Sequence, residues 1–287
     1  MKSRCLLSFL ILLLALSASS GDASAKVLSW SELSKMPLPS PGERVTYGNG
    51  PQHFGELRVP EGPGPFPVFI LIHGGCWQNA FDYVYMTRLA AWLTEHGVAT
   101  WTIEYRRLGD EGAGWPGTFL DVAHAADFVR ELAPKHHLDT NRVFAAGHSA
   151  GGQLALWLAA RKKLPSKSEL FLKEPIAIQG VLGLAAITDL AQYRIGPPDS
   201  CHASVEPLLG GEPDKVPQRY AETSPRQLVP LGIRQIFIHG VDDPIVDPVS
   251  LRSYLDAAQK AGDEVSTLPI PAAGHFESPT ILPTTEP

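Results

Sequence analysis

The chain has 287 residues, a formal net charge of -6 at pH 7 and a hydrophobic content of 44%. This composition is typical of a globular protein with a sizeable core, and it excludes a disordered or strongly basic chain. We therefore expect no nucleic-acid partner. The sequence does not predict an oligomeric state.

The first 25 residues have the parts of a secretory signal peptide. Lys2 and Arg4 precede an apolar run from about Leu6 to Leu16, and an Ala-Ser-Ala sequence ends at residue 25. The run is shorter than the roughly 20 residues that span a bilayer, so we expect no stable membrane anchor. The sequence predicts a secreted or periplasmic protein whose mature part, residues 26–287, forms a single domain.

Strand-like and helix-like segments alternate through the mature part. Two short strands with a Gly-Asn-Gly turn are expected within 44–60. Apolar runs then predict strands within 68–75, 98–105, 142–147, 178–187, 234–240 and 264–271, and helical spacing predicts helices within 81–97, 118–136, after 149 and within 248–262. Such alternation indicates an α/β fold with a mostly parallel sheet covered by helices on both faces.

One segment interrupts this alternation. From about residue 188 to 230 the sequence is rich in proline and has poor periodicity. It is too long for a plain connection, so we expect a cap-like insertion or a long loop over the carboxyl edge of the sheet.

A candidate nucleophile lies between a predicted strand and a predicted helix. The letters GHSAG, residues 147–151, match the pattern G-x-S-x-G, which in one fold family marks a sharp turn with an exposed serine hydroxyl. The pattern predicts that Ser149 is the nucleophile. A serine hydroxyl needs an imidazole to accept its proton and a carboxylate to orient that imidazole.

Both partners are expected at later strand ends. His275, in a loop of small residues after the last predicted strand, is the candidate base. Asp243 is the preferred acid in the sequence HGVDDPIVDP, with Asp242 and Asp247 as alternatives. Asp247 precedes a proline, so it is also a candidate helix N-cap.

Oxyanion donors are expected from the backbone. The sequence LIHGGCW places two glycines after a strand, where missing side chains let N–H groups face a developing negative charge. The expected donors are the amides of Gly75, Cys76 and Ala150, the last being the residue after the nucleophile. His73 is expected to brace this loop. No metal site and no cofactor are predicted.

In the order HGGCW, GHSAG, HGVDDPIV, AGHF, this chain resembles the α/β-hydrolase superfamily. The loop HGGCW is similar to that of kynurenine formamidases and of esterases of the hormone-sensitive-lipase type. The resemblance implies a Ser149–Asp243–His275 triad. Related chains usually continue into a last helix after the histidine, and we expect none here.

These patterns predict a serine hydrolase that cleaves carboxylic esters of small molecules through an acyl-enzyme. An arylformamidase that cleaves an amide is the alternative, and a non-catalytic binding domain is a further one. Among Trp77, Phe81, Tyr83, Tyr85, Trp115 and Tyr193, we expect Trp77 to be the best candidate for the substrate pocket because it adjoins the oxyanion loop.

The mature part contains two cysteines, Cys76 and Cys201. The predicted compartment permits disulfides, but spacing alone does not show whether two thiols approach closely enough to bond. A disulfide and two separate thiols both fit the sequence.

Overall fold

A computed structural model of the chain describes residues 27–280, so the predicted signal peptide lies outside the described residues. Their centre is an eight-stranded sheet in the order β1-β2-β4-β3-β5-β6-β7-β8. Strands β3 to β8 run parallel to one another, whereas β2 pairs antiparallel with both β4 and β1. The strands are β1 (Glu43–Thr46), β2 (Phe54–Arg58), β3 (Phe66–Ile72), β4 (Ala99–Ile103), β5 (Leu138–His148), β6 (Ile178–Leu184), β7 (Arg234–Gly240) and β8 (Val265–Ile270).

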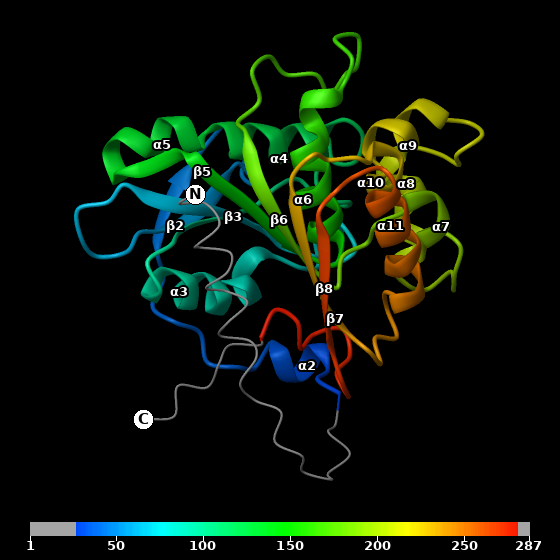
Figure 1. The fold of residues 1–287 in the computed structure, drawn as a ribbon, viewed down its shortest axis with the longest axis horizontal. Coiled ribbons are helices and arrows are strands. Elements are labelled where there is room, and N and C mark those ends of the chain that lie inside the picture. Colours follow the sequence, from blue (N-terminus) through cyan, green and yellow to red (C-terminus); the bar gives the residue numbers. More distant parts are fainter. Residues whose placement is uncertain (1–26, 281–287) are drawn as a thin grey trace.

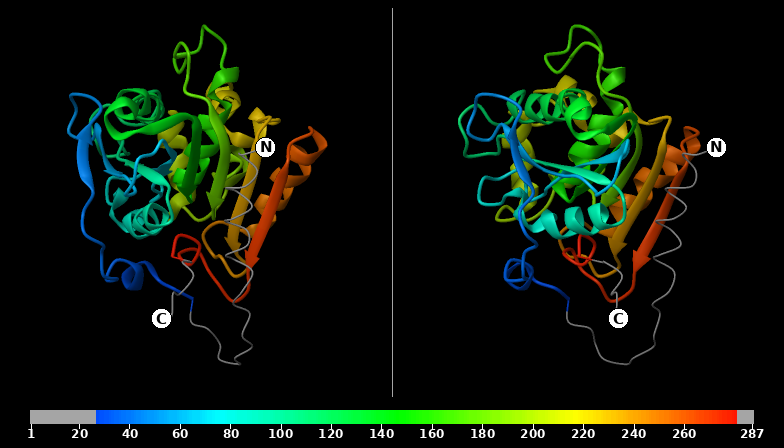
Figure 2. Two further views of the ribbon diagram at one scale, coloured as in Figure 1. Left: turned by 60° about the vertical axis from the view of Figure 1, so that its left-hand side comes forward. Right: turned by 90° about the vertical axis from the view of Figure 1, so that its left-hand side faces the viewer.

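Helices cover both faces of this sheet, as Figures 1 and 2 show. One face carries the short helix α2 (Trp30–Leu33) and α3 (Thr87–Glu95), which follows the 3-10 turn η1 (Tyr83–Met86). The other face carries α4 (Gly117–Asp127), α5 (Val129–His136), α6 (Ala150–Ala160) with the 3-10 turn η2 (Arg161–Lys163), and α11 (Pro248–Lys260). The predicted α/β class, with its mostly parallel sheet, is confirmed.

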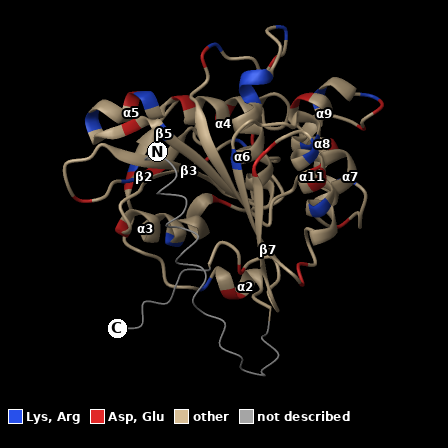
Figure 3. Ribbon diagram, viewed as in Figure 1, with Lys and Arg blue, Asp and Glu red and all other residues tan. Residues whose placement is uncertain are grey.

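Each face has its own apolar core. Trp157 of α6 and Tyr254 of α11 are fully buried on one face, and Leu71 of β3 packs with Leu93 of α3 on the other. Full burial of a side chain of this size contributes about 1.5–3 kcal/mol. Lys, Arg, Asp and Glu are spread over the outer elements without a block of one sign (Figure 3).

The predicted helix within 118–136 is two helices. Helices α4 and α5 meet at Phe128, which has α-helical angles but ends one helix and begins the next. Pro134 removes one backbone donor from α5. Helix α5 ends where His137 has a positive φ of 52°.

Residues 188–230 contain short helical segments, where poor periodicity predicted a cap or loop. They are α7 (Leu190–Tyr193), η3 (Cys201–Ser204), α8 (Val205–Leu209), α9 (Pro217–Thr223) and α10 (Pro225–Leu228). Apolar side chains such as Leu208 and Tyr220 anchor this segment to the core of the α6 face. After β8, residues 271–280 form turns and contain no helix. No helix within 27–280 has the length and apolarity needed to cross a membrane.

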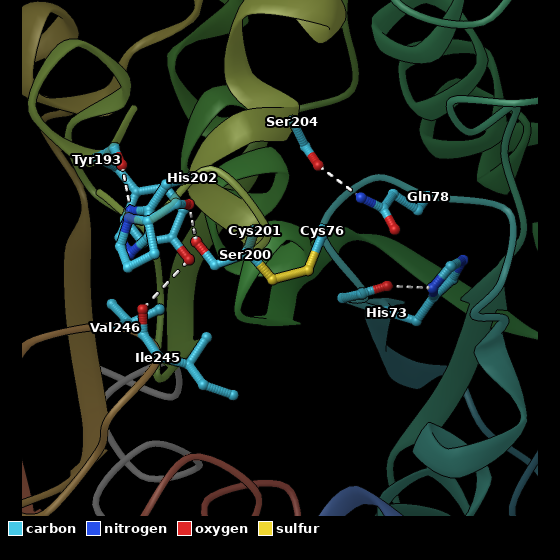
Figure 4. The surroundings of a disulfide bond; sticks show 12 residues. His73, Cys76, Gln78, Tyr193, Ser200, Cys201, His202, Ser204, Ile245 and Val246 are labelled. Carbon is cyan, nitrogen blue, oxygen red and sulfur yellow. Dashed lines mark hydrogen bonds between the residues drawn. A yellow bond between two sulfur atoms is a disulfide. The ribbon is translucent and has the colours of Figure 1, made fainter. Parts of the chain in front are cut away.

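A disulfide joins the cap-like segment to the loop after β3. Cys76 and Cys201 are bonded, with their Cα atoms 4.9 Å apart. Beside the bond, the Gln78 amide donates a hydrogen bond of 2.8 Å to the Ser204 hydroxyl (Figure 4). The bridge closes a loop of 125 residues, which restricts the unfolded chain strongly.

We predict that replacing both cysteines, in a Cys76→Ser/Cys201→Ser variant, lowers the free energy of unfolding by about 2–4 kcal/mol, because the unfolded chain regains its loop entropy. Urea unfolding of the oxidised protein and of the variant measures this difference. A reductant should lower the stability of the natural chain to that of the variant and leave the variant unchanged. Equal midpoints for the oxidised protein and the variant would contradict the prediction.

Candidate active site

Ser149 lies in a strained turn between β5 and α6. Its backbone angles are φ 56° and ψ -119°, outside the regions that a residue with a side chain normally adopts. Such strain costs on the order of 1–3 kcal/mol and persists only where the surroundings hold it. Strand β5 ends one residue before the serine and helix α6 begins one residue after it, so no loop residues separate the two elements from Ser149.

Backbone contacts hold this turn in place. The Ser149 N–H donates to the Leu184 carbonyl at 2.8 Å, and the Ser149 carbonyl accepts from Gly152 at 2.9 Å. A Cβ on Gly151 would lie 2.1 Å from the Ile72 carbonyl oxygen. The small residues of GHSAG therefore let α6 start directly against the end of β3.

His275 and Asp243 form a hydrogen-bonded pair. The His275 Nδ1 atom lies 2.8 Å from Asp243 Oδ2, and both side chains are buried. An ionised carboxylate only accepts hydrogen bonds, so Nδ1 carries the proton and Nε2 is left with its lone pair. The arrangement orients an imidazole that can accept a proton at Nε2.

Asp243 is held as a carboxylate by donors on both of its oxygens. Its Oδ1 accepts from the N–H groups of Ile245 at 2.8 Å and Val246 at 2.9 Å. Its Oδ2 also lies 3.2 Å from His239 Nε2. Burial raises the pKa of Asp243, but hydrogen bonds from His239 and His275 outweigh burial and hold that pKa well below its ordinary value.

The two rival aspartates lie elsewhere. Asp242 and Asp247 are exposed, whereas Asp243 is buried. The Asp247 side chain accepts a hydrogen bond from the Val249 N–H and is the N-cap of α11. The structure thus brings only Asp243, of these three, to His275. His239 was not identified from the sequence as a partner of the acid, although it directly precedes the GVDD turn.

The loop after β3 presents free backbone donors. Gly75, Cys76 and Trp77 all have positive φ values, of 97°, 56° and 55°. Within residues 27–280 the N–H groups of Gly75, Cys76 and Ala150 donate to no protein acceptor. Ala150 is also the first residue of α6, where the helix dipole favours a negative charge.

His73 holds the start of this loop in place through buried contacts. Its Nε2 lies 2.9 Å from the Glu104 carboxylate, and its Nδ1 lies 2.8 Å from the Gly74 carbonyl oxygen. The ring is fully buried and stacks on Tyr105 at a centroid distance of 4.6 Å. These contacts fix the end of β3 and the start of the donor loop.

Ser149 and His275 open into the same small cavity. Its volume is about 160 Å³, and its walls also include Gly75, Cys76 and His148. Aromatic and aliphatic side chains complete the lining, so the space beside the serine hydroxyl is almost wholly apolar. We call this space the inner chamber.

The prediction that Trp77 lines the substrate pocket is wrong. Its side chain is fully buried in the core and does not line the inner chamber. Nor does it line the adjoining cavity of about 830 Å³, which we call the outer cleft. The indole Nε1 donates to the Gln153 side chain at 3.2 Å, which ties the donor loop to α6.

The other aromatic candidates divide between these spaces. Phe81 and Tyr85 line the inner chamber, and Phe81 and Tyr193 line the outer cleft. Tyr83 and Trp115 line neither. Trp30 and Phe276 also line the inner chamber and were not predicted. Trp30 lies outside the motifs, and the AGHF sequence that contains Phe276 was used only to locate His275.

His148, the second letter of GHSAG, connects three parts of the site. The Gly74 N–H donates to the Tyr85 hydroxyl at 2.7 Å, and that hydroxyl lies 2.9 Å from His148 Nδ1. His148 Nε2 lies 3.0 Å from the carbonyl oxygen of His275. Since a carbonyl only accepts, Nε2 carries the proton and Nδ1 accepts from Tyr85. The chain of bonds links the donor loop to the backbone of the His275 loop.

This position keeps His148 uncharged. Complete burial is the main cause and the nearby His275 ring is the second, and together they lower the pKa of His148 to about 3. The neutral His148 ring lies beside the ring of His275. The ring centroids of the two histidines are 4.6 Å apart.

The lowered pKa of His148 predicts a stability that falls on acidification. Between its ordinary pKa near 6.5 and its value of about 3 in the fold, the unfolded chain binds a proton that the folded chain does not. This one group lowers the free energy of unfolding by up to about 1.4 kcal/mol per pH unit below pH 6. Urea unfolding from pH 7.5 to 4.5 measures the slope.

A matched pair of variants isolates the group responsible. His148→Gln should flatten the slope, whereas His124→Gln, at an exposed position of α4, should leave it unchanged. Parallel stability curves for the natural chain and His148→Gln would contradict this account.

Known proteins are similar to this chain in sequence. Esterase LipC of Mycobacterium tuberculosis (strain ATCC 25618 / H37Rv) is 27% identical and covers 81% of this chain, which in turn spans 59% of LipC. The probable isoprenylcysteine alpha-carbonyl methylesterase ICME of Oryza sativa subsp. japonica is 25% identical over 78% of this chain. This chain spans 55% of ICME, so it covers less than two thirds of both curated relatives.

A solved structure extends the likeness in fold. A truncated carbohydrate esterase from gut microbiota aligns with a TM-score of 0.71 at 21% identity, covering 83% of this chain and 90% of that one. A family model described as BD-FAE matches residues 57–254. Because that match includes more than half of the chain, the chain belongs to the BD-FAE family, and its fold is that of the α/β-hydrolases.

Proposed function

We propose that this protein is a serine hydrolase that cleaves carboxylic esters through an acyl-enzyme. One observation carries the proposal: Ser149 and the hydrogen-bonded His275 border the same cavity as the unpaired N–H groups of the donor loop. The curated relatives are named as esterases, which favours ester over amide substrates. The lone pair on His275 Nε2 supplies the base that a serine hydroxyl needs.

In the first half of the reaction Ser149 Oγ attacks the ester carbonyl carbon and its proton passes to His275 Nε2. The carbonyl oxygen becomes an oxyanion and accepts hydrogen bonds from the N–H groups of Gly75, Cys76 and Ala150. Such donors typically lower a barrier by about 2.7–4 kcal/mol each. His275 then gives its proton to the alcohol oxygen, the ester C–O bond breaks, and the acyl group stays on Ser149.

In the second half, water replaces the alcohol. His275 takes a proton from the water, the oxygen attacks the acyl carbon, and the same donors stabilise the second oxyanion. The bond to Ser149 Oγ breaks, Oγ regains the proton from His275, and the carboxylic acid leaves. Asp243 stays ionised throughout and holds His275 in the required tautomer.

We further propose that the protein acts outside the cytosol. The signal-peptide pattern in residues 1–25 and the Cys76–Cys201 disulfide both favour an oxidising compartment. Residues 26–287 then form one catalytic domain, with 188–230 as a cap that carries half of the disulfide.

We predict that Ser149→Ala lowers kcat for a short-chain p-nitrophenyl ester by at least about 10⁴-fold, because the nucleophile is lost. Asp243→Asn should cost about 10⁴-fold, since an amide cannot hold the His275 tautomer. Asp242→Asn is the matched control, because Asp242 is the exposed neighbour, and it should keep its activity. Labelling of the natural chain, but not of Ser149→Ala, by a fluorophosphonate reports the nucleophile directly.

A substrate panel separates ester from formamide cleavage. Short acyl esters and feruloyl esters are compared with N-formylkynurenine by kcat/KM, and we expect the esters to be turned over faster. Faster turnover of the formamide would replace the esterase proposal with a formamidase. Absence of both fluorophosphonate labelling and hydrolysis would overturn the proposed catalysis as a whole.

A further inference from the structure

Four aromatic side chains line the inner chamber. They are Trp30, Phe81, Tyr85 and Phe276. The Trp30 ring packs edge-on against Phe81 and Tyr85, with centroid distances of 5.0 and 5.5 Å, and lies 5.9 Å from Phe276. Trp30 therefore contacts each of the other three walls and closes the chamber between them.

Trp30 belongs to an N-terminal segment, residues 27–36, that crosses the carboxyl edge of the sheet beside the His275 loop (Figure 1). We call this segment the strap. The strap begins before the family match at residue 57, so the family resemblance says nothing about it. Its short helix α2 is stabilised by a capping box in which Ser29 and Glu32 bond each other's backbone N–H groups.

The strap is fastened at both ends. At its start, the Glu277 carboxylate accepts from the Leu28 N–H with one oxygen and from the Gly274 N–H with the other. At its far end, Leu33 is buried in the apolar core of the α3 face. Glu277 lies two residues after His275, so one carboxylate holds both the strap and the loop of the proposed base.

A second, larger space adjoins the inner chamber, and both cysteines of the disulfide line both spaces. This outer cleft has a volume of about 830 Å³ and shares Cys76, Cys201, Phe81 and Ile245 with the inner chamber. Polar side chains from the donor loop and the cap line it, namely Gln78, Asn79, Asp199, Ser200, His202 and Ser204. The two spaces thus differ in both size and polarity.

We propose that the strap completes an acyl-binding chamber and that Trp30 is a specificity-determining residue that limits the acyl group to a short, apolar chain. This inference rests on the proposed ester hydrolysis. The chamber holds the volume of about five water molecules at roughly 30 Å³ each, which is the size of a short acyl chain and not of a long one. A larger, more polar alcohol fits the outer cleft.

The order in which the two products leave indicates which part of the ester occupies each space. The alcohol leaves while the acyl group is still bonded to Ser149, so the alcohol needs the side that is wide and open. The acyl group remains at the serine and occupies the small space that Ser149 itself borders. An apolar lining favours an apolar acyl chain, and the polar groups that the outer cleft adds among its apolar ones can bind the hydroxyl groups of an alcohol.

The test varies acyl length at constant alcohol. For the natural chain, kcat/KM for p-nitrophenyl esters should fall steeply from butyrate to octanoate. Trp30→Ala removes the wall, and the ratio of octanoate to acetate kcat/KM should rise by at least tenfold, because one misfitting methylene in an apolar pocket already costs about 10-fold or more. Trp30→Phe should give an intermediate ratio.

Trp92→Ala is the matched control. Trp92 of α3 packs at the edge of the same apolar core as Trp30 but does not line the inner chamber. It should keep the natural ratio of octanoate to acetate. Fluorophosphonate labelling of Ser149 in each variant shows that the site has folded.

Two results would overturn the inference. One is an unchanged ratio in Trp30→Ala when Ser149 still reacts with the fluorophosphonate. The other is a change confined to the alcohol, seen with ethyl and octyl acetates, which would place the alcohol in the inner chamber. Failure of the proposed function looks different, since the natural chain itself would then hydrolyse no ester and take no label.

Discussion

The strained backbone of Ser149 is the constraint on which the rest of the site depends. A left-handed serine is tolerable only because β5, β6 and α6 surround it with backbone hydrogen bonds and because the glycines beside it have no Cβ. From this turn Ser149 lines the inner chamber, and the Ala150 N–H at the start of α6 donates to no acceptor within the described residues. The parallel sheet supplies the other groups at the same edge, since the loops after β3, β7 and β8 all begin there.

Two buried histidines beside this turn, His275 and His148, have different hydrogen-bond partners. The Nδ1 atom of His275 donates to the Asp243 carboxylate, whereas His148 bonds a hydroxyl and a carbonyl, and burial lowers the pKa of His148. Because His148 binds the backbone of the His275 loop, a neutral His148 also fixes where the second ring sits.

Sequence patterns predicted the strands, the α/β class and the meeting of His275 with Asp243, because strand periodicity and parallel topology determine these features. They did not predict which aromatic residues face the chamber. Trp77 adjoins the donor loop in sequence, but its ring is buried in the core. Phe276 and His239 lie within AGHF and HGVDDPIV, but those patterns do not show which of their side chains contact the site. Trp30 reaches the chamber from a segment far away in sequence, and periodicity carries no information about such contacts. The disulfide was left open for the same reason.

The Glu277 clamp has a consequence for the nascent chain. It joins residues 28 and 277, which are 249 positions apart, and His275 lies in the same late loop. A ribosome that has made the nucleophile turn, the donor loop and the cap has therefore not yet made the base or the group that fastens the strap. The proposed base and the group that fastens the strap therefore come from one late segment, and a chain that lacks this segment has Ser149 with neither of them.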